Sequence, residues 1–136
     1  MNDIYSYKDL VVYQRSRELT RLVYAVIRQL PPSESKNLYD QLSRAVISVS
    51  SNIAEGNARI GTQDYIHYLG MARASNAEVQ AQLQACLDIG YCREEDIEAA
   101  MAMSARVAQM LNKLINSLRR KMIIDKANKN YENWDK

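Results

Sequence analysis

Apolar residues recur every three or four positions along most of this chain, and this is the spacing of one face of an α-helix. Four stretches carry such a stripe. The pattern predicts helices over about residues 8–30, 33–55, 62–89 and 93–124. Their apolar stripes are Leu19, Leu22, Val23, Val26, Ile27 and Leu30 in the first helix, Leu38, Leu42, Ala45, Val46, Val49 and Ile53 in the second, Tyr65, Leu69, Ala72, Val79, Leu83 and Cys86 in the third, and Ile97, Met101, Ala108, Leu111, Leu114, Ile115, Leu118 and Met122 in the fourth.

The breaks between these stripes hold residues that start or end helices. Pro31 and Pro32 end the first helix, because proline lacks a backbone donor and displaces the residue before it from helical geometry. Gly56 and Gly90 are natural residues to follow the second and third helices. Thr62 has the side chain of an N-cap for the third helix.

The order of these elements predicts the fold class. A chain of 136 residues suits one domain. Four long helices with short connections predict an all-α fold, an antiparallel up-down-up-down four-helix bundle, over residues 1–124. Residues 125–136 are polar, and we expect a frayed or disordered tail. Docking of Tyr131 and Trp134 onto the bundle is the alternative.

Composition mainly bears on location. No apolar run of about 18 residues is present, so we expect no membrane span. Charged residues such as Lys8, Asp9 and Arg15 interrupt the apolar stretches near the N-terminus, unlike in a signal peptide. We therefore expect a cytoplasmic protein. The formal net charge of +2 is too small to indicate a nucleic-acid binder by itself.

Two helices carry a second line of residues beside the core stripe. The line on the second helix consists of polar residues without a lysine, whereas the line on the third helix consists of small residues. These lines favour close contact between helices or subunits, and the alternative is a solvated surface on helix-forming residues. The polar line is Gln41, Arg44, Ser48, Asn52 and Glu55, and the small line is Ala74, Ala77, Ala81 and Ala85.

Basic residues form two further lines, opposite the apolar stripes of the first and fourth helices. Such lines fit a surface that contacts phosphates, and ordinary solvated charge is the alternative. The candidate nucleic-acid-binding residues are Arg17, Arg21 and Arg28 on the first helix, and Arg106, Lys113 and Arg120 on the fourth.

The residue types that most enzymes need are scarce. The single histidine, His67, follows Asp64 at the spacing of bundle iron ligands, but a di-iron site needs two such pairs. Cys86 and Cys92 cannot make a disulfide framework or an all-cysteine zinc site. Glu55 and Glu78 could face each other between the second and third helices, where paired carboxylates can perform acid–base work. A structural partnership with Arg44, Asn52 or Ser75 is the more economical interpretation. We therefore expect no catalytic residue, no metal and no cofactor.

Residues 41–56, QLSRAVISVSSNIAEG, resemble the signature of the four-helix-bundle proteins encoded in 23S rRNA intervening sequences. The resemblance covers about residues 7–118 and includes Ser75 and Glu78 of the third helix. It departs at Ala74, where the family usually has glycine, and at Arg93, where a serine-type cap is common. The signature and interface positions that the resemblance implies are Gln41, Arg44, Ser48, Asn52, Glu55, Gly56, Ser75 and Glu78.

The resemblance implies a ring-like homopentamer without enzymatic activity. The same family includes the accessory variability determinant of diversity-generating retroelements, which binds nucleic acid and a reverse transcriptase. That relative is strongly basic, so the net charge of +2 favours a more general family member. The leading hypothesis is a non-enzymatic homo-oligomeric scaffold that binds RNA or DNA non-specifically. The alternative is a protein–protein adaptor, for example for a reverse transcriptase.

Overall fold

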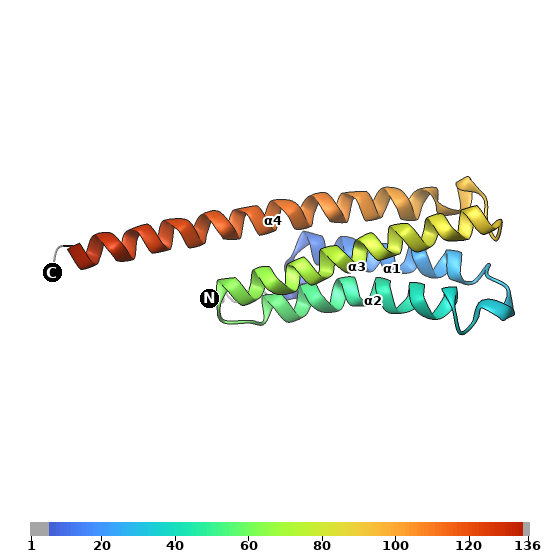
Figure 1. Cartoon of the computed structure of the whole chain (residues 1–136), viewed down its shortest axis with the longest axis horizontal. Coiled ribbons are helices and arrows are strands. Elements are labelled where there is room, and N and C mark those ends of the chain that lie inside the picture. Colours follow the sequence, from blue (N-terminus) through green and yellow to red (C-terminus); the bar gives the residue numbers. More distant parts are fainter. Residues whose placement is uncertain (1–5, 135–136) are drawn as a thin grey trace.

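The computed structural model describes residues 6–134, and four α-helices dominate this part of the chain. They are α1 (Val11–Ile27), α2 (Leu38–Asn57), α3 (Thr62–Ile89) and α4 (Glu94–Trp134). Two short 3-10 helices, η1 (Tyr7–Asp9) and η2 (Pro32–Glu34), precede α1 and α2. Each long helix packs against two others, in the cyclic order α1, α2, α3, α4 (Figure 1). The all-helical bundle is therefore confirmed, and residues 6–134 contain no strand.

The helix boundaries differ from the prediction where a local bond interrupts helical geometry. Before α1, the side chain of Ser6 accepts a bond from the Lys8 amide, and residues 7–9 form a 3-10 turn. Before α2, a Glu34 carboxylate oxygen accepts from the Leu38 amide at 3.3 Å. This carboxylate thus caps α2, and the helix starts five residues later than predicted.

The ends of α3 agree closely with the prediction. The helix spans Thr62–Ile89, but its N-cap is Gly61, so the expected capping role of Thr62 is wrong. Gly90 takes the left-handed conformation, with φ of 91°, and closes the helix as expected. A side chain at this position would be strained.

The core lies between the four helices and contains almost all of the predicted stripes. In α4 the buried line is rotated slightly, because Ala100, Ser104 and Val107 are buried while Met101 and Ala108 are only half-buried.

Residues 125–134, for which the sequence predicted a frayed or disordered tail, continue α4 as one helix through Trp134 (Figure 1), and residues 135 and 136 lie outside the described part of the chain. No glycine or proline follows Gly90, and the arginine, lysine, methionine, alanine and glutamate residues of this segment favour helix. Tyr131 is 73% exposed and does not dock onto the bundle. The expected boundary at residue 124 falls inside this continuous helix.

A hydrogen bond joins the α1–α2 connection to the α3–α4 connection at one end of the bundle. The Tyr91 hydroxyl donates to Glu34 Oε1 at 2.8 Å. This bond lowers the pKa of the Glu34 carboxyl and raises the pKa of the Tyr91 hydroxyl. Glu34 therefore links the α1–α2 connection to the α3–α4 connection while it caps α2.

Candidate functional site

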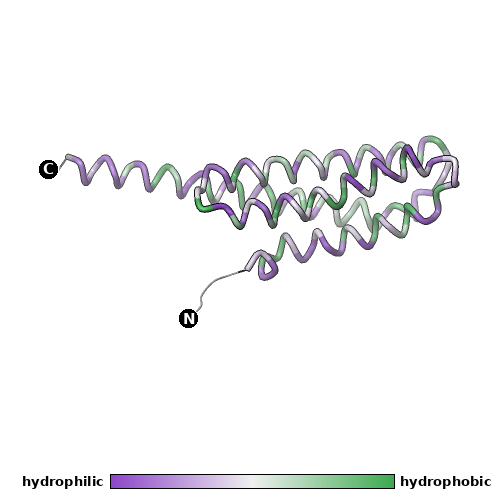
Figure 2. Tube along the Cα trace, turned by 90° about the horizontal axis from the view of Figure 1, so that it is seen from below, coloured by the Kyte–Doolittle hydropathy of each residue, from purple (hydrophilic) through white to green (hydrophobic). Residues whose placement is uncertain are grey.

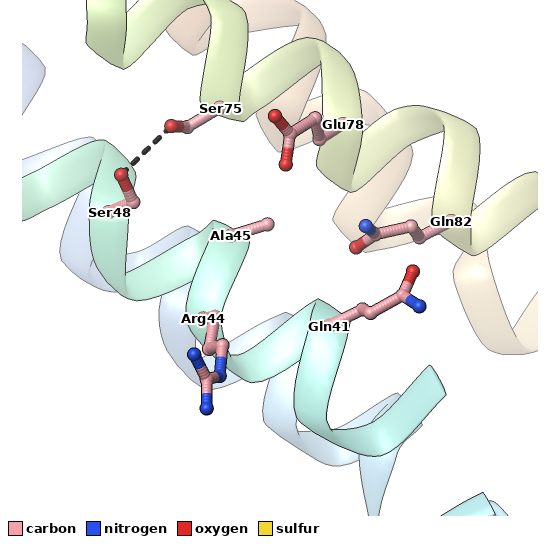
Figure 3. Close-up of a pocket in the computed structure, with 7 residues that line it drawn as sticks. All are labelled: Gln41, Arg44, Ala45, Ser48, Ser75, Glu78 and Gln82. Atoms are coloured by element: carbon pink, nitrogen blue, oxygen red, sulfur yellow. Dashed lines mark hydrogen bonds between the residues drawn. The ribbon is translucent and has the colours of Figure 1, made fainter. Parts of the chain in front are cut away.

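The middle of the polar line on α2 bonds to α3. The hydroxyls of Ser48 and Ser75 lie 2.9 Å apart across the two helices (Figure 3). The Asn52 amide donates to both the Ser48 hydroxyl and the Ser48 carbonyl, each at 2.9 Å. These three half-buried residues form one network between α2 and α3.

Beyond this network the two helices separate and leave a polar groove of about 410 Å³. Gln41 of α2 and Gln82 of α3 reach toward each other across it, and Glu78 lies between Gln82 and Ser75 (Figure 3). The Gln82 side-chain oxygen is buried without a hydrogen-bond partner among the described residues. The groove therefore holds an acceptor that a neighbouring donor would satisfy.

Arg44 belongs to the signature and lines the groove, but its guanidinium points away from α3 (Figure 3). Its Nε lies 3.1 Å from Asp40 Oδ1, one helical turn earlier. The Arg44 side chain is 79% exposed, so this ion pair contributes little to stability. Arg44 is available to a partner of the α2 face.

The end of the polar line makes a different set of contacts. Arg59 Nη2 lies 2.8 Å from Glu55 Oε1 and donates to the Tyr68 hydroxyl at 2.7 Å. Its guanidinium also sits 4.6 Å from the centre of the Tyr68 ring. Glu55 is thus held beside Tyr68, whereas Glu78 lines the groove farther along. The two carboxylates are not brought together as a pair.

Gly56 lies inside α2, so its predicted role as the residue after the helix is wrong. The residue is buried against the start of α3. A Cβ atom added there would lie 2.9 Å from Tyr68 Cβ and 3.2 Å from the Tyr65 carbonyl oxygen. Glycine is needed here for close helix packing rather than for a left-handed turn.

The small line on α3 faces outward. Ala74, Ala77 and Ala81 are exposed, and Ala85 is half-buried. Among the described residues, therefore, no helix covers Ala74, Ala77 or Ala81, whereas Ala85 packs against the edge of the core. It remains an open face next to the polar groove.

All six residues of the two basic lines are exposed. The ion pairs among residues 6–134 involve Arg15, Arg44, Arg59 and Arg93, and none of the six basic-line residues. The two lines lie on α1 and α4, which pack side by side. None of the six therefore forms an ion pair with a carboxylate of the described residues, and their charges face water.

The sequence reasoning missed a buried polar pair between α3 and α4. Asn76 Nδ2 donates to the Ser104 carbonyl at 2.9 Å, and the Ser104 hydroxyl donates to Asn76 Oδ1 at 2.7 Å. The Gln80 amide adds a bond to the Ser104 hydroxyl at 2.9 Å. The sequence did indicate this position, because Asn76 falls at helical spacing between Ala72 and Val79 and so lies on the apolar stripe that faces the core.

Both cysteines are buried. Burial is the largest cause that raises the pKa of the Cys86 thiol, to about 11, and the nearby Cys92 thiol adds to it. Burial likewise raises the pKa of Cys92. His67 is exposed, and its ring contacts the Tyr68 ring edge-on at 5.6 Å.

We expect the folded protein to resist thiol alkylation, because only thiolate reacts and about one Cys86 thiol in a thousand is ionised at pH 8. Labelling of Cys86 should be at least about a hundredfold slower than in urea. Mass spectrometry of a Cys92→Ser variant treated with iodoacetamide measures this rate. Equal rates in the folded and unfolded protein would contradict the burial of Cys86.

Comparisons with known proteins agree with this architecture. The sequence profile described as 23S rRNA-intervening sequence protein matches residues 8–113. Among solved structures, this chain is similar to a protein of unknown function from the S23 ribosomal protein family of Bacteroides thetaiotaomicron. The TM-score is 0.71 at 23% identity, over 77% of this chain and 98% of that one. No curated protein sequence matches this chain.

Proposed function

Since this chain belongs to the 23S rRNA-intervening sequence protein family, we propose that it is a non-enzymatic scaffold that binds RNA or DNA and associates with copies of itself. No helix of residues 6–134 is both long enough and apolar enough to cross a membrane. The proposal concerns two surfaces, the basic lines and the face formed by α2 and α3.

One observation supports nucleic-acid binding above the others. Six basic side chains are exposed on two adjacent helices, and no carboxylate of the described residues pairs with them. Four other arginines, in contrast, have carboxylate partners. When unpaired surface cations neutralise phosphates, the counterions that had condensed on the nucleic acid are released. This release favours binding without sequence specificity.

The α2–α3 face supports self-association. It combines the groove with its unsatisfied Gln82 oxygen, the exposed Arg44, and the small line on α3. A cyclic ring needs two different contact surfaces on each subunit, and this face would supply one of them. Five is the copy number that the family resemblance leads us to propose.

We expect labelled duplex DNA and structured RNA to bind at low salt, with affinity that falls steeply as salt rises. Fluorescence anisotropy over a salt series measures this, and light scattering on the same samples gives the number of copies. Replacing Arg17, Arg21 and Arg28 by glutamine should lower the salt slope for duplex DNA by up to about 2.7.

The matched control replaces Arg15, Arg59 and Arg93, which carry the same total charge but already have carboxylate partners. If the wild type binds neither nucleic acid at low salt, the proposed function is wrong. A protein–protein adaptor would then be the better proposal. If both triple variants lose the same affinity, the α1 line is not a contact surface.

A further inference from the structure

The last part of α4 extends beyond the rest of the molecule. Figure 1 shows this helix continuing past the start of α3 and the α2–α3 loop. Among the side chains that the structure describes, Ile115 is the last buried one along α4, and Leu118 and Met122 are half-buried. Every side chain described from Ile123 onward is exposed. We call residues 119–134 the α4 arm.

The sequence of the α4 arm does not suit packing against its own bundle. Continuing the core line of α4 beyond Met122 leads to polar residues, among them Asp125, Lys129 and Asn133. Figure 2 shows a largely hydrophilic arm with one short hydrophobic stretch. A helix of this length without packing is marginally stable in water. A partner outside the chain's own bundle would therefore stabilise it.

The α4 arm carries a positive net charge, whereas the rest of the chain is close to neutral. The α4 arm, residues 119–134, holds five basic and two acidic residues, which gives a net charge of +3. Residues 1–118 hold twelve basic and thirteen acidic residues, which gives −1. The positive net charge of the protein thus comes from this end of α4, and an anionic partner would be drawn to the arm rather than to the bundle as a whole.

The basic residues surround the arm instead of lining one face. Successive helix residues point about 100° apart, so Arg119, Arg120 and Lys121 point in three directions. Lys126 falls near the direction of Arg119, and Lys129 falls between Arg119 and Lys121. Cations on several sides suit a groove that has phosphates on both flanks, such as the major groove of duplex DNA.

The same arrangement does not suit a flat lipid surface. A helix that lies on a membrane keeps its apolar face free of charge. In the arm, Arg120 points between the directions of Ile123 and Ile124, which are 67% and 58% exposed. A charge therefore interrupts the apolar side.

We propose that the α4 arm is the principal nucleic-acid contact of this protein and binds the phosphate backbone. The proposal rests on the proposed function, since it assigns a site to that binding. It adds Arg119, Lys121, Lys126 and Lys129 to the basic line that ends at Arg120. The arm also lies outside residues 8–113, so it is an addition to the part of the chain that the family profile matches.

The chain offers a matched pair of variants for the test. The arm variant replaces five basic residues of the arm by glutamine, and the bundle variant replaces five exposed basic residues of α1 and α4. Both remove five charges and introduce a residue that favours helix. The arm variant is R119Q/R120Q/K121Q/K126Q/K129Q, and the bundle variant is R17Q/R21Q/R28Q/R106Q/K113Q.

Anisotropy with labelled duplex DNA and an RNA hairpin should show that the arm variant binds at least about tenfold more weakly than the bundle variant. The salt slope for duplex DNA should fall by up to about 4.5 in the arm variant. The DNA and RNA titrations distinguish the two sources of phosphate. Circular dichroism checks that both variants fold. If the arm variant unfolds, Lys126→Glu with Lys129→Glu tests the same site far from the bundle.

Each other outcome would overturn the assignment. Equal losses would mean that binding follows total charge and not the arm. A larger loss of affinity in the bundle variant would show that the basic lines, and not the arm, are the principal contact, while the proposed nucleic-acid binding would remain supported. Binding of the wild type to anionic phospholipid vesicles, without binding to either nucleic acid, would make the arm a membrane contact. A wild type that binds nothing refutes the proposed function together with the arm.

Discussion

Replacing Asn76 by alanine is expected to lower the free energy of unfolding by about 2–4 kcal/mol, the largest effect that we expect from a single substitution. Asn76 is 1% exposed and bonds twice to Ser104, which is fully buried. The change leaves the Ser104 hydroxyl without its acceptor and opens a cavity between α3 and α4. Urea denaturation followed by circular dichroism measures the loss.

The Asn76 prediction has a matched control in the same pair of helices. Asn112 of α4 accepts a bond from Arg73 of α3 at 3.0 Å, but this contact is exposed. Asn112→Ala should change stability by less than about 0.5 kcal/mol, because water replaces the lost bond. Similar losses in the two variants would contradict the importance of the buried pair.

A double-mutant cycle separates the pair from its surroundings. Ser104→Ala alone should cost about 1–3 kcal/mol, because it leaves Asn76 Oδ1 unsatisfied. Combining it with Asn76→Ala removes both partners, so the double variant should cost less than the two single changes together. Strict additivity would show that Asn76 and Ser104 act independently.

The second large effect is expected at Gly56. Alanine favours helix over glycine by about 0.5–1 kcal/mol, but overpacking a tight contact costs about 1–3 kcal/mol. Here the added methyl would meet Tyr68 Cβ at 2.9 Å and the Tyr65 carbonyl oxygen at 3.2 Å. Neither atom is the end of a flexible side chain, so overpacking prevails. We expect Gly56→Ala to destabilise the protein by about 1–2 kcal/mol.

Gly70 provides the control for Gly56. It lies within α3, and a Cβ added there would meet no atom within 4 Å. Gly70→Ala should therefore stabilise the protein by about 0.5–1 kcal/mol through helix propensity alone. Thermal and urea unfolding of the two variants show directly whether each substitution raises or lowers the stability of the protein. If Gly56→Ala also stabilises, the α2–α3 contact is looser than its geometry indicates.

The helices were the most predictable part of the fold. An apolar residue every three or four positions must be buried on one face, and the predicted span of α3 agrees closely with the observed one, although its N-cap is Gly61 and not Thr62. Starts and ends that depend on side chains of other segments were less predictable. The start of α2 depends on the Glu34 carboxylate, and Glu34 is itself held by Tyr91 of a distant loop.

The candidate site was predictable only in part. Exposed basic lines follow from the position of the core stripe, because residues opposite a buried face point into water. Contact of the polar line on α2 with another helix or subunit was anticipated, but the specific bond between Ser48 and Ser75 was not. The pairing of Asn76 with Ser104 was missed, since a polar residue inside an apolar stripe has no defined partner until two helices are aligned.

The sequence by itself determined how many helices form and which face of each turns inward, because these follow from short-range periodicity along one chain. Only the tertiary structure decided that Gly56 serves close packing, that Glu55 and Glu78 lie apart, and that α4 extends past the ends of the other helices. These outcomes depend on the register and length of one helix against another. That register is set by contacts between residues far apart in the chain, so a local pattern does not contain it.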